Sequence, residues 1–217
     1  MSFLEKFSII KSVPIPHFKP AAPILRQDAF DDTDYLFELK HDGFRALAYV
    51  DHNRVRVVSR HAKTYKSFFP LCEAIAREVK CGEAVLDGEI VCLDSEGRPQ
   101  FYDLLRRRGK PVFYAFDLLW LDGKDLRDLS LITRKHLLRS VVPKESAWLL
   151  YADHIDQHGM ELFRLACDRD LEGIVAKYKF GAYGESWWKI RNPTYSQREG
   201  RHELFDRKRA RAVGAGG

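Results

Sequence analysis

The chain has 217 residues, of which 45% are hydrophobic and 12% aromatic, so it can build a core and general disorder is excluded. No run approaches the roughly 18 apolar residues of a membrane-spanning helix, and the charges among residues 1–20 exclude a secretory signal. The net charge of +5 is a moderate basic excess, which suits a polyanionic partner such as nucleic acid.

Strand and helix patterns then alternate along the chain. Residues 35–40 and 44–50 are predicted strands, and the short turn between them predicts a hairpin. The other predicted elements are strands over residues 55–59, 84–93, 111–121, 172–178 and 186–191, and helices over residues 71–79, 131–142 and 160–167. Hairpins interspersed with helices predict an α+β fold with mainly antiparallel sheets rather than a doubly wound parallel sheet.

One domain with a flanking segment at each end is the predicted organisation. Residues 1–33, rich in Pro and Asp from residue 12, are expected to form a leader that wraps the domain at residues 34–195. Residues 196–217 are a basic tail, which we expect to be partly disordered. The four cysteines show no CxxC spacing, so we expect reduced thiols in a cytoplasmic protein without membrane contact.

A lysine at the end of an apolar strand is the first candidate catalytic residue. Lys40 is followed at once by a turn, so its amine projects from a rigid backbone, and Arg45 points toward the same pocket from the next strand. Such an amine is a covalent nucleophile when burial and neighbouring cations lower its pKa below about 10.4. The alternative is a plain hairpin in which Lys40 and Asp42 only decorate the turn.

Carboxylates and lysines within later strands favour a nucleotide pocket. Glu89 lies in an apolar strand, where it requires a cation, a metal or a ribose hydroxyl as partner. Glu172 and Lys177 stand at opposite ends of another strand, and Lys189 and Arg191 share one strand face. Converging lysines and carboxylates are unstable unless a polyphosphate and a metal lie between them. A Walker or Rossmann site is excluded, because GxxxxGK[ST] and GxGxxG are both absent.

These segments together resemble the adenylation domain of ATP-dependent DNA ligases, a branch of the covalent nucleotidyltransferases. The family motif of lysine, any residue, Asp-Gly, any residue, Arg is matched by Lys40, Asp42, Gly43 and Arg45. Further matches, in the family's order, are residues 59–60, 86–91, 114–119, Arg134, 172–177 and 188–191. The amino-acid sequences of these motifs most resemble those of the bacterial end-joining ligases. The resemblance implies an α+β, ATP-grasp-like nucleotidyltransferase fold with mainly antiparallel sheets, flanking helices and a central nucleotide cleft.

The resemblance also implies a mechanism and a set of site residues. Lys40 would attack ATP, release pyrophosphate and carry AMP to a 5′-phosphate of nicked or broken DNA, which a 3′-hydroxyl then seals. The implied nucleotide-binding residues are Glu38, Leu39, Arg45, Arg60, Glu89, Phe116, Glu172, Lys177, Lys189 and Arg191. Phe116 would stack on adenine, and Lys177 and Lys189 would contact the α-phosphate. Glu89 and Glu172 would hold Mg²⁺ or Mn²⁺.

The chain departs from the family in two places. Family ligases usually continue into an OB-fold, for which residues 192–217 are too short. We therefore expect an adenylation domain without the OB-fold, a monomer active in DNA repair and helped by a DNA-end-binding or OB-fold-bearing protein. Arg191 stands where many relatives have a second lysine, which keeps the charge but changes the geometry.

Three alternative functions stay open. Two share the lysine chemistry, namely an RNA ligase and a GTP-using capping-type enzyme. The third is a nucleic-acid-binding accessory protein that keeps the fold without turnover and acts through its basic surface.

Overall fold

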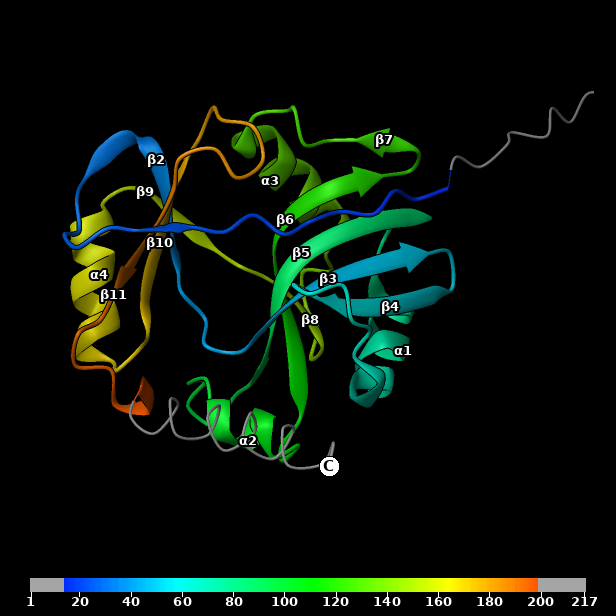
Figure 1. The fold of residues 1–217 in the computed structure, drawn as a ribbon, viewed down its shortest axis with the longest axis horizontal. Helices are drawn as coiled ribbons and strands as arrows, with labels where there is room; N and C mark the ends of the chain where they lie inside the picture. The colour runs from blue at the N-terminus through cyan, green and yellow to red at the C-terminus, as the bar shows by residue number, and fades with distance from the viewer. Residues whose placement is uncertain (1–13, 199–217) are drawn as a thin grey trace, which may run out of the picture.

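Two β-sheets form the body of the protein in the computed structural model, which describes residues 14–198 (Figure 1). Sheet A has the strand order β1-β11-β10-β2-β9, and sheet B has the order β4-β3-β5-β6-β7 with β8 beside β6. Most pairs are antiparallel, while β1 with β11 and β6 with β8 are parallel. The predicted α+β class with mainly antiparallel sheets is confirmed.

The elements follow one another in this order. The strands are β1 Ile24–Leu25, β2 Asp32–Leu39, β3 Phe44–Asp51, β4 Arg54–Ser59, β5 Glu83–Cys92, β6 Pro111–Leu121, β7 Lys124–Asp125, β8 Leu149–Tyr151, β9 His154–Gln157, β10 Gly173–Tyr178 and β11 Trp187–Arg191. The helices are α1 Phe69–Glu78, α2 Phe101–Leu105, α3 Leu131–Val141 and α4 Gly159–Asp168, with 3-10 turns at Lys66–Phe68 and Ser196–Arg198. None of the helices in this part of the chain is long and apolar enough to cross a membrane.

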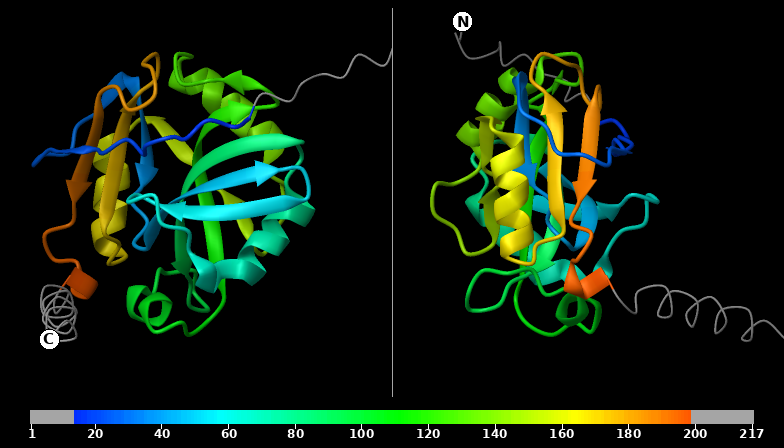
Figure 2. Two further views of the ribbon diagram at one scale, coloured as in Figure 1. Left: turned by 45° about the vertical axis from the view of Figure 1, so that its right-hand side comes forward. Right: turned by 90° about the vertical axis from the view of Figure 1, so that its left-hand side faces the viewer.

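The helices cover one face of each sheet. Apolar side chains of α1 and α3, such as Leu71 and Leu138, pack on sheet B with Ala48 of β3. Helix α4 lies along β2 and β10 of sheet A (Figure 2). Leu162 of this helix packs against Phe37. Because strand side chains alternate between faces, Glu38 points away from α4, on the face of sheet A that is free of this helix.

The predicted hairpin over residues 35–50 is wrong, because its two strands lie in different sheets. β2 pairs with β9 and β10 of sheet A, whereas β3 pairs with β4 and β5 of sheet B. Both strands contain runs of buried residues, and the buried backbone N–H and C=O groups on each side need a partner strand. Residues 40–43 consequently cross from one sheet to the other, which brings Lys40 to the junction of the sheets.

The segment before β1 runs across both sheets (Figure 1, blue). Phe18 is buried against Tyr49 and Trp120 of sheet B, and the Ala21 amide donates a hydrogen bond to the Tyr183 hydroxyl, 3.0 Å away. β1 then joins the edge of sheet A beside β11. Residues 1–13 of the expected leader and residues 199–217 of the expected tail lie outside the described residues, and the domain boundaries stay a prediction.

Gly43 makes the crossing possible, because the chain passes directly over β5 at this residue. A Cβ atom on Gly43 would lie 2.0 Å from the Ile90 carbonyl oxygen, which is backbone and cannot move aside. We predict that Gly43→Ala lowers the free energy of unfolding by about 1–3 kcal/mol, the usual cost of overpacking. Chemical denaturation of the two proteins measures the difference.

Gly82→Ala is the matched control, because within 4 Å its Cβ would meet only a side-chain oxygen of Asp122, at 3.3 Å, and no backbone atom. Equal stabilities of Gly43→Ala and the unmodified chain would show that the crossing has room for a side chain.

Candidate active site

The predicted site residues converge from both sheets. On the helix-free face of sheet A, strand register sets Glu38 beside Val175 and Val175 beside Lys189. On sheet B, Arg45 and Glu89 are register partners on neighbouring strands. The charge of Lys40 affects the pKa of Glu89 on sheet B and that of Lys189 on sheet A. The charged side chains of the two sheets therefore lie around Lys40.

Lys40 is held by an ion pair at the junction of the sheets. Its Nζ lies 2.7 Å from Glu172 Oε2, and the two side chains are 22% and 12% exposed. The Lys40 backbone amide donates to the Gly173 carbonyl oxygen at 2.9 Å, which fixes the main chain below the amine. The amine is thus partly withdrawn from solvent and has a carboxylate within proton-transfer distance.

Other cations approach the same point. The pKa of Lys189 is lowered, first by burial and then by the charges of Arg191 and Lys40. A lysine kept among like charges in this way favours the arrival of an anion. Arg191 itself is exposed at the end of β11.

Glu89 supplies a second carboxylate close to Glu172. Burial is the main reason that the pKa of Glu89 is raised to about 7, and the charges of Glu172 and Asp87 add to the effect. The charges of Lys40 and Arg45 act in the opposite direction. Two neighbouring carboxylates, one of them holding its proton near neutral pH, are a donor set that a hard divalent cation fits and would deprotonate.

Phe116 on β6 lies between two cations. The Arg45 guanidinium carbon is 4.3 Å and the Lys177 Nζ 4.4 Å from the centroid of its ring. Arg45 is fixed by Asp87, whose two oxygens accept hydrogen bonds of 2.6 Å each from the guanidinium. Tyr183, on the loop between β10 and β11, also donates to Asp87 and so connects sheet A to this arginine.

A buried charge cluster lies farther along β2, around Glu38. Its carboxylate is 2.7 Å from Lys135 Nζ and 2.6 Å from Lys177 Nζ. The charges of these two lysines outweigh burial and lower the pKa of Glu38 to about 2. The expected contact of Lys177 with the α-phosphate stays a prediction, and its amine lies here beside Glu38 and the Phe116 ring.

Lys135 is a member of this cluster that the sequence interpretation missed. It lies on α3, one residue after Arg134, and it is 2% exposed. The available signal was its spacing, four residues after Leu131 and three before Leu138, which places it on the buried face of the helix. A lysine on such a face requires a buried acid as partner.

Two predicted residues have neighbours other than these charged groups. The Leu39 side chain packs on the α4 side of sheet A, so only its backbone can face a nucleotide. Arg60 is exposed after β4, where its Nε lies 3.1 Å from His61 Nε2. A nucleotide or 5′-phosphate contact of Arg60 stays a prediction.

Asp117 and Arg134 form a fully buried pair behind the site. Nε of Arg134 donates to Asp117 at 2.8 Å, and the same carboxylate accepts the Leu118 amide at 2.8 Å. Asp117 thus joins β6 to α3 and contacts the backbone, as a structural acid does.

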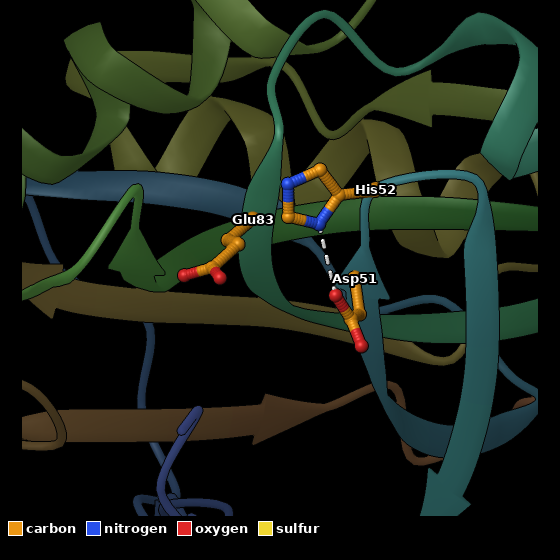
Figure 3. Close-up of side chains that lie close together, drawn as sticks. All are labelled: Asp51, His52 and Glu83. Carbon is orange, nitrogen blue, oxygen red and sulfur yellow. Dashed lines mark hydrogen bonds and ion pairs between the residues drawn. The ribbon is translucent and has the colours of Figure 1, made fainter. Parts of the chain in front are cut away.

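Asp51, His52 and Glu83 form a separate cluster, at the opposite end of β3 from Arg45 (Figure 3). Their ligand atoms lie within 4.8 Å of one another, and the His52 imidazole is paired with Asp51 at 3.0 Å. Strand register accounts for the proximity, because Asp51 is the direct partner of Glu83. Asp51 and His52 are exposed to solvent, and we assign no metal to the cluster.

The family model of the ATP-dependent DNA ligase domain matches residues 24–191, which include both sheets and every charged group described above. The chain belongs to the ATP-dependent DNA ligase family. Among relatives of this ligase domain, the multifunctional non-homologous end joining protein LigD of Mycolicibacterium smegmatis is 33% identical over 162 residues. The match covers 71% of this chain and 21% of LigD, so the chain spans about a fifth of that relative.

A shorter relative and solved ligase structures agree with the family. The SPbeta prophage-derived DNA ligase-like protein LigB of Bacillus subtilis is 29% identical over 79% of this chain and 66% of its own length. The ligase domain of LigD from M. tuberculosis superposes with a TM-score of 0.65 at 30% identity, over 79% of this chain and 59% of that one. A mycobacterial DNA ligase D complexed with ATP and MES gives a TM-score of 0.67 at 29% identity, over 80% and 60%. The nucleotidyltransferase fold that the sequence predicts is therefore confirmed.

The crossing that carries Lys40 is fixed by aromatic side chains. His41 stacks on Tyr114 with ring centroids 4.0 Å apart, and the Tyr195 hydroxyl donates to Asp42 at 2.8 Å. Burial is the main reason that the pKa of His41 falls from 6.5 to about 4. His41 is therefore neutral in the folded protein at neutral pH.

His41 makes the stability of the ligase domain depend on pH. Between pH 6.5 and about 4 the unfolded chain binds a proton at His41 that the folded chain does not, so stability falls as the pH falls. We predict that the unmodified chain loses on the order of 2 kcal/mol more than His41→Phe over this range, since phenylalanine keeps the stack without titrating. Chemical denaturation at several pH values measures the difference.

His136→Phe is the control, because His136 lies exposed on α3. Parallel pH profiles of His41→Phe and the unmodified chain would show that His41 is protonated in the folded state as easily as in the unfolded one.

Proposed function

We propose that this chain is an adenylating DNA ligase domain in which Lys40 carries AMP. The observation that carries the proposal is the position of Lys40 at the junction of the sheets, 2.7 Å from Glu172. The charges of Glu89 and Lys189 around this amine support the same assignment.

The first step needs an unprotonated amine. Glu172 Oε2 accepts a hydrogen bond from the Lys40 ammonium and so orients it, and the ammonium releases its proton to water before the amine attacks. The free amine attacks the α-phosphorus of ATP, and the bond from that phosphorus to the bridging oxygen of the β-phosphate breaks. A lysyl–AMP phosphoramidate forms, and pyrophosphate leaves with the electron pair of the broken bond.

The other groups bind the nucleotide and stabilise developing charge. Phe116 would stack on the adenine, and Arg45 and Glu89 would hold the ribose. Lys189 meets the α-phosphate, where negative charge grows in the transition state. When bound, Mg²⁺ or Mn²⁺ neutralises the phosphates, and Glu89 and Glu172 are the carboxylates that would hold it.

The later steps concern DNA. AMP passes from Lys40 to the 5′-phosphate of a nick or break, and a 3′-hydroxyl displaces AMP to form the phosphodiester bond. A role in the repair of broken DNA is part of this proposal, and its support is the similarity to relatives named for non-homologous end joining. A monomeric state and a protein partner that binds DNA ends or carries an OB-fold are also parts of this proposal.

The alternatives differ in nucleotide and in turnover. The match to an ATP-dependent DNA ligase domain favours ATP and DNA over the RNA ligase and the GTP-using enzyme. A chain that is labelled with AMP from ATP but not with GMP from GTP is not the GTP-using capping-type enzyme. A chain that binds DNA but never becomes labelled would be the non-catalytic accessory protein.

We predict that Lys40→Ala abolishes covalent labelling and keeps the fold, because no other amine can form the phosphoramidate at this position. Intact mass spectrometry after incubation with ATP and Mg²⁺ should show a gain of about 329 Da, one AMP, for the unmodified chain only. Lys144→Ala is the control, since Lys144 is exposed, and it should label normally. Labelling of Lys40→Ala would assign the chemistry to a different residue.

We predict that Lys189→Met slows AMP labelling by about a hundredfold or more, the usual effect of losing one preorganised electrostatic group. Methionine keeps the length of the side chain without its charge. Single-turnover labelling at saturating ATP measures the rate, and circular dichroism checks the fold. A rate within about threefold of the unmodified chain would make Lys189 a structural residue of β11.

A further inference from the structure

The cluster around Glu38 contains one more positive charge than negative charge. Lys135 and Lys177 both approach the Glu38 carboxylate, one at each oxygen. The three residues are 2% to 3% exposed, so solvent contributes little to their charge balance. Burying a second ammonium beside one carboxylate is unfavourable, and a methionine at either lysine would fill the space without that cost.

The two lysines are bound to Glu38 in different ways. Lys135 Nζ donates hydrogen bonds to Glu38 Oε1 at 2.7 Å and to the Ala152 carbonyl oxygen at 2.8 Å. Lys177 Nζ lies 2.6 Å from Glu38 Oε2, and this buried Nζ has no other acceptor in the described structure. Lys135 therefore has two acceptors, whereas Lys177 has the Glu38 carboxylate alone.

Apart from Glu38, the neighbours of Lys177 Nζ in the described structure are aromatic rings rather than hydrogen-bond acceptors. Its Nζ lies over the Phe116 ring at 4.4 Å and over the Trp187 ring at 4.3 Å. Ring faces attract a cation but accept no full hydrogen bond from it. The pKa of Lys177 is lowered, mainly by burial, while that of Lys135 is raised by Glu38 despite its burial.

We propose that Lys135 is a positioning residue, the permanent counter-ion of Glu38, which frees Lys177 to turn from Glu38 to the bound nucleotide. Without Lys135, a departing Lys177 would leave Glu38 as a buried carboxylate without a cation, which costs several kcal/mol. Lys177 would then stay on Glu38. The inference rests on the proposed function only in taking ATP as the ligand.

Equilibrium binding of ATP tests this role. Binding is measured in the Lys40→Ala background, where no covalent step follows. Lys135→Met should weaken ATP binding by about tenfold or more, the effect of one lost charge-assisted hydrogen bond from Lys177. Lys135→Arg keeps the positive charge beside Glu38, and its binding should change by less than about threefold. Lys144→Met, at an exposed lysine, is the matched control.

A second background separates positioning from a merely structural role. Glu38→Gln removes the charge that Lys135 balances, so adding Lys135→Met to Glu38→Gln should change ATP binding by no more than about twofold. A structural lysine would cost the same factor in both backgrounds. This comparison holds even when Lys135→Met alone does not fold, because the double variant buries no uncompensated carboxylate.

Three results would overturn the inference. They are unchanged ATP binding in Lys135→Met, a tenfold loss on adding Lys135→Met to Glu38→Gln, and no measurable ATP binding by the Lys40→Ala protein. The proposed function has its own readout, AMP labelling of the chain with Lys40 intact. A chain that binds ATP as expected but is never labelled would refute the lysyl–AMP chemistry and leave the role of Lys135 standing.

Discussion

Ionised groups enclosed between two sheets are the constraint on which this structure depends. Charges withdrawn from water are stable only in pairs, and each pair here ties together segments that are distant in sequence. Lys40 with Glu172 joins the crossing to β10, and Arg45 with Asp87 joins β3 to β5. The groups to which we assign the chemistry are thus also groups that hold the sheets in place.

The connection between the sheets gives the site its geometry. A hairpin would have placed Lys40 at the edge of one sheet, facing solvent. Because residues 40–43 cross between the sheets, β2 and β3 pair with different strands. Lys40 therefore lies between strands of both sheets that carry charged side chains. Tyr183 also connects the sheets. It lies on a loop of sheet A and donates a hydrogen bond to Asp87, the carboxylate that orients Arg45 on sheet B.

The sequence predicted local features well and partners between distant segments poorly. The long strands and the helices near residues 71–79, 131–142 and 160–167 follow from apolar spacing, and the convergence of Lys40, Glu89 and Glu172 follows from ordered motifs. The short strands β1, β7, β8 and β9 were missed, because a few residues carry too little pattern. The hairpin was wrong for a similar reason, since the choice of partner strand depends on the whole sheet. Lys135 was missed because its acid, Glu38, is 97 residues away.

The residues directly after β11 hold the segment that crosses between the sheets. Tyr195 binds Asp42, two residues from Lys40, and Gln197 accepts a hydrogen bond from the Phe101 amide at 3.0 Å. Residues 195–197 therefore connect the loop at Asp42 to the start of α2. Local unfolding of these residues would release both segments at once, so order at this end of sheet A and the position of the Lys40 backbone are linked.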